Sequence, residues 1–141
     1  MHEVLVPVVD DHDQRWVVDF LAQEHERDPL VVHLLSVQPR YSGHVRMFVD
    51  PALIHEAQEE DAQAQMKPMC EALSARGIPY HAHVVEGSTA EQIASYAQAH
   101  DCQQIVIGPP RAGWSSERVL GSVNRQVEQL LRHAGRPCEV L

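Results

Sequence analysis

IVIGPPRAGWSSERVLGSVNRQ (105–126) is the stretch of sequence that decides the fold. An apolar run ends at Gly108, a loop with two prolines follows, and Gly121-Ser122 opens a segment with helical spacing. A strand, a loop and a helix N-terminus in this order favour an anion, because the free N–H groups and the dipole of the helix attract negative charge. In the alternative interpretation, Gly108 only ends a strand and Ser122 only caps a helix.

Five short apolar runs, each typical of a β-strand, are separated by segments with helical spacing. They cover residues 3–9, 29–37, 80–85, 103–108 and 137–141. This alternation predicts an α/β fold, with a mainly parallel open sheet and helices on both of its faces. The near-continuous apolarity of the first, second and fourth runs predicts strands buried on both faces. No linker or repeat divides the chain, so residues 1–141 are expected to form a single domain.

The start of each helix carries a capping signal. Carboxylates crowd the start of the first helix at 10–13, and Trp16, Val17, Phe20 and Leu21 then form its apolar stripe. Asp50-Pro51 places an N-cap before a proline at the first helical position. The helix from Pro51 runs toward Gly77, and Pro68 is expected to kink or break it. Residues 88–91, Ser-Thr-Ala-Glu, form a capping box, and Ser122 is expected to cap the last helix.

Composition excludes several classes of partner. The formal net charge is −9 and the 11 basic residues are scattered, which argues against a nucleic-acid interface. The apolar runs are far shorter than a membrane span, and the N-terminus reads as the first strand of a cytoplasmic protein. Three cysteines without a CxxC pair fit reduced thiols. The 10 histidines are interpreted as surface composition rather than as a pH sensor.

The familiar catalytic and nucleotide motifs are missing. The sequence has no GxGxxG after its first strand, no GxxxxGK[ST], no GxSxG and no HExxH. No residue is therefore predicted to be catalytic.

Two groups of side chains suggest a metal, and each has a simpler explanation. Asp10, Asp11 and Asp13 resemble Mg²⁺ ligands, but acidic residues at a helix N-terminus also cap the helix. His81 and His83 are two apart on a predicted strand and share one face, a spacing that suits a transition metal. A polar face is also normal at the edge of a sheet, so no metal ligand is assigned.

The chain resembles the universal stress protein family, of the UspA type, along nearly its full length. The similarity lies in EVLVPVV (3–9), VVHLLSVQP (31–39), the stretch 76–108 and GSVNRQVEQLLRHAGRPCEVL (121–141). The resemblance implies an adenine-nucleotide alpha-hydrolase-like, Rossmann-like sheet of strand order 3-2-1-4-5. It also implies a homodimer that pairs its last strands, and some members of the family bind ATP.

The glycine motif of the ATP-binding members is altered in this sequence. Gly108 matches the first glycine and Gly121-Ser122 the closing pair, but Arg111 stands on the second glycine. An arginine there either obstructs the path of the backbone or pairs with a phosphate itself. Gly113 lies nearby and would restore part of the flexibility.

A second departure falls at the end of the first strand. The binders carry an aspartate two residues after the position of Pro7, where this chain has Val9 followed by Asp10. Because side chains alternate along a strand, the Asp10 carboxylate is expected to point the other way unless the strand bulges.

The resemblance implies a stress-response regulatory protein without enzymatic turnover, whose cleft holds ATP or AMP with Mg²⁺. The alternative is a dimeric interaction module that binds no nucleotide. A nucleotide hydrolase or transferase is a third reading, for which no base or nucleophile is visible. The implied nucleotide-binding residues are Pro7, Val8, Val9, Asp10, Val37, Ile107, Gly108, Arg111, Gly113, Gly121, Ser122, Val123 and Asn124.

Overall fold

The computed structural model describes residues 2–9, 12–39, 50–109, 123–135 and 138–141. These residues form a five-stranded parallel sheet of order β3-β2-β1-β4-β5. β1 (His2–Pro7) is central and pairs with β2 (Leu30–Gln38) and with β4 (Gln104–Ile105). β3 (Tyr80–Glu86) and β5 (Glu139–Val140) are the two edges. The predicted α/β fold and the strand order implied by the resemblance are confirmed.

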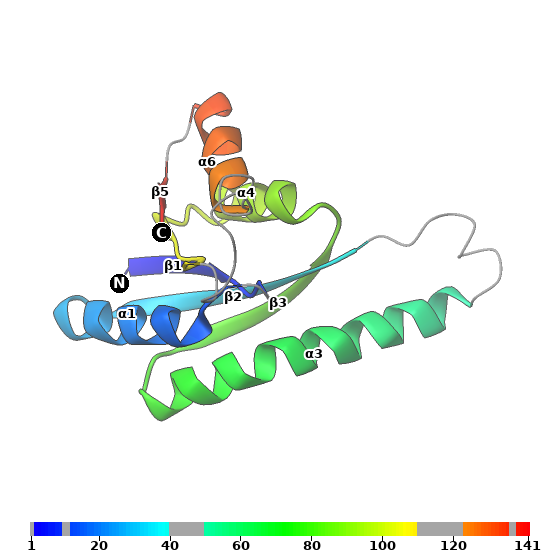
Figure 1. Ribbon diagram of the computed structural model, residues 1–141, viewed down its shortest axis with the longest axis horizontal. Coiled ribbons are helices and arrows are strands. Elements are labelled where there is room, and N and C mark those ends of the chain that lie inside the picture. The colour runs from blue at the N-terminus through cyan, green and yellow to red at the C-terminus, as the bar shows by residue number, and fades with distance from the viewer. Residues whose placement is uncertain (1, 10–11, 40–49, 110–122, 136–137) are drawn as a thin grey trace.

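Within the described residues, helices cover both faces of the sheet (Figure 1). α1 (Gln14–Arg27) and α3 (Pro51–Ala75) pack on one face, and α4 (Thr89–Ala99) and α6 (Val123–His133) pack on the other. Alternate residues of β1 separate the two cores: Val4 and Val6 belong to the first and Leu5 to the second. This alternation follows from the pleat of the strand, which points successive side chains to opposite faces.

The order of the strands determines where a ligand cleft can form. The chain moves outward from β1 to β2 and β3, then returns to the other side of β1 as β4 and β5. Connections after β1 and β4 therefore diverge at the carboxyl ends of these strands, and ligands of open α/β sheets bind at such a point. The end of β4 leads to Gly108, as the opening stretch predicts.

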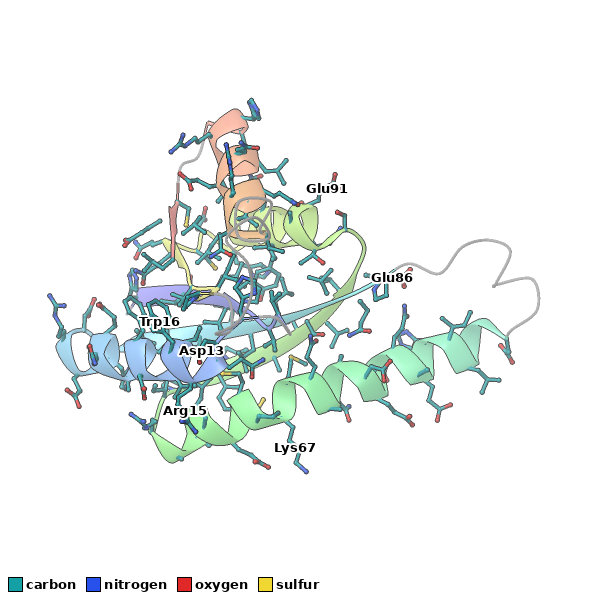
Figure 2. All side chains as sticks on the ribbon, viewed as in Figure 1. Asp13, Arg15, Trp16, Lys67, Glu86 and Glu91 are labelled. Atoms are coloured by element: carbon teal, nitrogen blue, oxygen red, sulfur yellow. The ribbon has the colours of Figure 1, made fainter. Side chains whose placement is uncertain are left out.

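The capping predictions are confirmed in part. The Asp13 side chain accepts a hydrogen bond from the Trp16 N–H, and Asp50 accepts one from the Ala52 N–H. The cap at Asp13 supports helix capping over metal binding for this carboxylate, as its position beside the first turn of α1 in Figure 2 illustrates. Ser88 is the N-cap of α4, but its side chain makes no capping hydrogen bond, so the predicted capping box is wrong in this respect.

Two further expectations are corrected. α3 runs as one helix through Pro68, so the predicted break does not occur. Met66, Met69 and Leu73 anchor this part of the helix in the core, and their burial offsets the hydrogen bond that proline removes. Trp16, expected on the buried stripe of the first helix, is 39% exposed and stacks on Phe20. No helix within the described ranges is long and apolar enough to cross a bilayer.

Candidate functional site

Gly108 follows β4 and lies against the start of α1. Its φ of +87° is in the left-handed region that favours glycine. A Cβ at this position would lie 2.7 Å from Cγ2 of Val17 and 3.4 Å from the carbonyl oxygen of Asp13. The glycine is therefore required both by the backbone conformation and by the packing of α1. Its presence alone does not distinguish a ligand cradle from a structural turn.

Asn124 joins three separate parts of the chain at the first turn of α6. Its Nδ2 donates to the carbonyl oxygens of Gly108 (3.3 Å) and Leu141 (3.4 Å). Its Oδ1 lies 3.0 Å from Nε2 of His12. Because Oδ1 only accepts, Nε2 of His12 must carry the hydrogen. The start of α6 is thus fixed to the end of β4, to the last residue and to the segment before α1.

The segment that leads into α1 lies against the residue after Gly108. The Asp13 N–H donates to the Pro109 carbonyl oxygen at 2.8 Å. His12 beside it is only 7% exposed, and its buried Nδ1 has no hydrogen-bond partner among the residues that the structure describes. Pro109, which has no N–H to offer an anion, thus contributes its carbonyl oxygen to the contact with α1.

A cavity of about 190 Å³ opens at the carboxyl ends of β1 and β2. It is lined by Pro7, Val8, Val9, Leu35, Val37, Gln65 and Thr89. The lining combines the ends of two buried strands with one residue of α3 and the first residue of α4. Five of its lining residues have apolar side chains, yet more of the wall is polar than apolar, with the amide of Gln65 and the hydroxyl of Thr89 among the polar groups.

Buried polar side chains of β2 orient the amide in this cavity. The Ser36 hydroxyl donates to Oε1 of Gln65 at 2.7 Å, and Nε2 of Gln38 donates to the Ser36 oxygen at 3.1 Å. Ser36 is fully buried and Gln38 is 9% exposed. Since buried hydrogen bonds of this kind hold side chains in one rotamer, the amide of Gln65 is presented to the cavity in a fixed orientation.

The predicted site residues separate into three groups. The first group lines the cavity, and it comprises Pro7, Val8, Val9 and Val37. The second lies near the end of β4 or on α6, outside the cavity lining, and it comprises Ile107, Gly108, Val123 and Asn124. The third lies outside the described residues, and it comprises Asp10, Arg111, Gly113, Gly121 and Ser122.

Ile107 does not line this cavity. It is 2% exposed and belongs to the core under α4 and α6, so its side chain is not part of the cavity wall. Leu35, Gln65 and Thr89 line the cavity although the sequence did not point to them. Only Thr89 carried a signal, as the residue after the N-cap of α4, because the helix that follows β3 has to begin at the carboxyl edge of the sheet.

The thiols near the sheet are poor nucleophiles. Burial raises the pKa of Cys102 to about 11, with a further contribution from the Glu3 carboxylate. Burial also raises the pKa of Cys138. Both thiols therefore stay protonated near neutral pH, whereas the thiolate is the reactive form. Among the described side chains, no group of three histidine, cysteine or carboxylate residues is arranged to hold a metal ion.

Replacing Asn124 with alanine should destabilise the protein by about 1–3 kcal/mol. The substitution removes the hydrogen bonds to two carbonyl oxygens and leaves Nε2 of His12 without its acceptor. The change is measured by urea unfolding. Arg125→Ala, at the exposed neighbouring position, is the control and should change the free energy by less than about 0.5 kcal/mol. Equal effects of the two substitutions would show that the Asn124 contacts contribute nothing.

These features define a class of protein. A parallel sheet of order 3-2-1-4-5, with a cavity at the carboxyl ends of its strands and a glycine before a helix beside it, is an adenine-nucleotide alpha-hydrolase-like α/β protein. The model of the universal stress protein family matches residues 1–141. The chain therefore belongs to the universal stress protein family.

Solved structures with this fold cover nearly the whole chain. A universal stress family protein from Burkholderia pseudomallei matches with a TM-score of 0.66 at 18% identity, covering 99% of this chain and 94% of its own. A family protein from Arabidopsis thaliana with AMP bound matches with a TM-score of 0.65 at 14% identity. The match covers 100% of this chain and 91% of the Arabidopsis chain. The universal stress protein from Archaeoglobus fulgidus in complex with dAMP matches with a TM-score of 0.58 at 22% identity. The match covers 99% of this chain and 97% of the Archaeoglobus chain. No curated protein matches the sequence significantly.

Proposed function

We propose that this protein binds an adenine nucleotide, AMP or ATP, in the cavity at the carboxyl ends of β1 and β2. In this proposal it acts as a cytoplasmic stress-response protein through binding, not through turnover. The observation that carries the proposal is the cavity itself, because it lies where ligands of open parallel sheets bind. Solved relatives that hold AMP and dAMP support the same class of ligand.

The cavity wall suits a purine base. Val9, Leu35 and Val37 offer apolar contacts to the faces of a ring, and the amide of Gln65 and the hydroxyl of Thr89 offer hydrogen bonds to its edge. The Asp10 carboxylate that the resemblance associates with the base or ribose lies outside the described residues. In this proposal the base is recognised by the uncharged amide of Gln65 and the uncharged hydroxyl of Thr89.

The phosphates are proposed to lie at the N-terminus of α6. The first N–H groups of a helix have no intrahelical acceptor, so those of Val123 and Asn124 are suited to an anion. The side chain of Asn124 is already committed to Gly108, Leu141 and His12, so its contribution would come from the backbone. Arg111, Gly121 and Ser122 are proposed to complete the phosphate site, with Mg²⁺ when the ligand is ATP.

The direct test is calorimetric titration of the purified protein with AMP, ADP and ATP, each with and without Mg²⁺. We expect saturable binding with a dissociation constant below about 1 mM, a binding free energy of at least about 4 kcal/mol. Protein purified without added nucleotide is also denatured, and its supernatant is analysed for adenine nucleotides. Guanosine monophosphate is the ligand control. No heat with any adenine nucleotide and none released would exclude the proposal.

The second candidate is a homodimeric interaction module that leaves the cavity empty. Gly108 favours it, because packing against α1 explains that residue without any ligand. β5 is an edge of the sheet in the single chain, so it is the strand through which the family's dimer would be built. Sedimentation equilibrium measures the oligomeric state. A dimer that binds no adenine nucleotide would support this candidate, and a monomer that binds one would exclude it.

A further inference from the structure

Four of the 10 histidines meet on one face of the sheet together with a tyrosine. This histidine cluster consists of His33, His81, His83, Tyr96 and His100. His33 comes from β2, His81 and His83 from β3, and Tyr96 and His100 from the last part of α4 and its C-cap. His33 is buried, whereas His81 and His100 are exposed, so the interpretation of the histidines as surface composition fails for His33.

The cluster lies at the opposite end of α4 from the cavity. α4 starts at Thr89, which lines the cavity at the carboxyl ends of the strands. His33 faces His81 across the β2–β3 pair, near the middle of β2 and at the beginning of β3. Figure 2 labels Glu86 at the end of β3 and Glu91 in the first turn of α4, so these two carboxylates belong to the cavity end of the helix. The cluster thus holds only the C-terminal half of α4.

The rings of the cluster are in close contact. Tyr96 stacks on His100 with ring centroids 4.1 Å apart, and His33 stacks on His83 at 6.1 Å. The centroids of His33 and His100 are 5.7 Å apart, and His83 and His100 are 6.3 Å apart. The Tyr96 hydroxyl is 3.0 Å from Nδ1 of His33. Neutral rings attract one another at these distances, whereas imidazolium rings repel.

His33, the buried member of the cluster, lies beside a single carboxylate of β1. His33 is 7% exposed, and its buried Nε2 makes no hydrogen bond to any described residue. Glu3 of β1 is its nearest ionic partner, with Oε1 3.5 Å from this nitrogen. A positive charge on His33 would therefore lie close to one carboxylate, that of Glu3. A second charge on His83 or His100 would lie about 6 Å from the first.

The remaining titratable groups around the cluster are neutral or peripheral. Burial raises the pKa of Tyr96 to about 12, so its hydroxyl keeps its proton. Cys102, which follows α4, is also protonated near neutral pH. Asp101 lies beside His100 in the sequence and adds a carboxylate at the rim. In the described part of the chain, no three donor side chains of the cluster are arranged to hold a metal ion.

We propose that the histidine cluster is an acid-sensitive latch, which holds the C-terminal half of α4 on the sheet while its rings are neutral and releases it when several are protonated. Release relieves the repulsion between rings and exposes His33 to water. Because the same helix begins at Thr89, the latch also connects acidification to the wall of the cavity.

The direction of the pH effect follows from His83. Burial, and then the charges of His33, His100 and His81, lower its pKa below the ordinary value of 6.5. The unfolded chain therefore binds this proton more readily than the folded chain does. Stability is fully present above pH 6.5 and falls as the pH drops through 6.5 toward the lower pKa of the folded state. Each proton taken up on unfolding lowers the folding equilibrium constant by up to about tenfold per pH unit.

The test compares urea unfolding of the full chain at pH 7.5, 6.5 and 5.5, without nucleotide and with a chelator present. His83→Gln/His100→Gln removes two rings of the cluster, and His55→Gln removes an exposed histidine of α3 that pairs with Glu59. We expect the equilibrium constant of the wild type to fall about tenfold more than that of the double variant between pH 7.5 and 5.5. His55→Gln should follow the wild type. An equal fall in all three proteins would overturn the latch.

Hydrogen exchange locates the effect and does not require the variants to fold well. Amide protection of wild-type residues 89–100, corrected for the intrinsic pH dependence of exchange, should fall selectively at pH 5.5 while α1 on the other face stays protected. A uniform loss of protection in α1 and α4, or none in α4, would overturn the proposal. Neither measurement involves nucleotide, so failure of the latch and failure of nucleotide binding are separate results.

Discussion

Gly108→Ala should destabilise the protein by about 2–4 kcal/mol. The new methyl group would enter a left-handed backbone at φ +87° and would lie 2.7 Å from Cγ2 of Val17. Val17 is 2% exposed and is held between α1 and the sheet, so it cannot move aside without disturbing the core. Urea unfolding measures the change.

Gly77→Ala is the matched control for this substitution. Gly77 has a similar φ of +69°, but a Cβ there would meet nothing within 4 Å. Gly77→Ala should therefore lower the free energy of unfolding by the backbone strain alone, about 1 kcal/mol. The difference between the two variants isolates the close approach of α1 at Gly108. Equal losses would show that α1 shifts freely, and the packing role of Gly108 would then be wrong.

Val37→Trp should lower the affinity for AMP at least tenfold, a loss of about 1.4 kcal/mol or more. Val37 lines the cavity of about 190 Å³, and an indole ring there would occupy the space proposed for the base. The fold of the variant is checked by its unfolding midpoint, and its affinity is measured by calorimetry. Thr89→Trp fills the same cavity from α4 and should have the same effect.

Val84→Trp controls for a tryptophan added to the sheet. Val84 lies on β3, is 42% exposed and does not line the cavity. Its substitution should leave AMP affinity within about twofold of the wild type, and the unfolding free energy within about 0.5 kcal/mol. Unchanged AMP affinity in the folded Val37→Trp and Thr89→Trp variants would place the nucleotide elsewhere on the molecule.

Sequence patterns predicted the strands because a strand that is buried on both faces consists mainly of apolar residues. The runs 3–9 and 29–37 became β1 and β2, and the third run, 80–85, became the edge strand β3. Pro68 shows where such local rules fail. Its effect on a helix depends on how firmly Met66, Met69 and Leu73 are packed, which no local pattern reveals.

The cavity was predictable only along β1 and β2. Pro7, Val9 and Val37 follow from the position of the strand ends in any parallel sheet of this order. The sequence did not point to Gln65, because this residue lies in the middle of a 25-residue helix and no sequence motif marks its position. Its place at the cavity follows from the path of α3 across the sheet and from its hydrogen bond to Ser36.

By itself, the sequence determined the α/β class, the strand positions, the helix caps at Asp13 and Asp50, and the resemblance that predicted the strand order. These features depend on short-range periodicity and on capping, which neighbouring residues decide. Three features depend on tertiary contacts: Gly108 packs against Val17, Asn124 joins three segments, and four histidines meet near the C-terminal end of α4. Each of these contacts joins residues far apart in the chain, so its energy depends on how the helices pack on the sheet and leaves no local mark in the sequence.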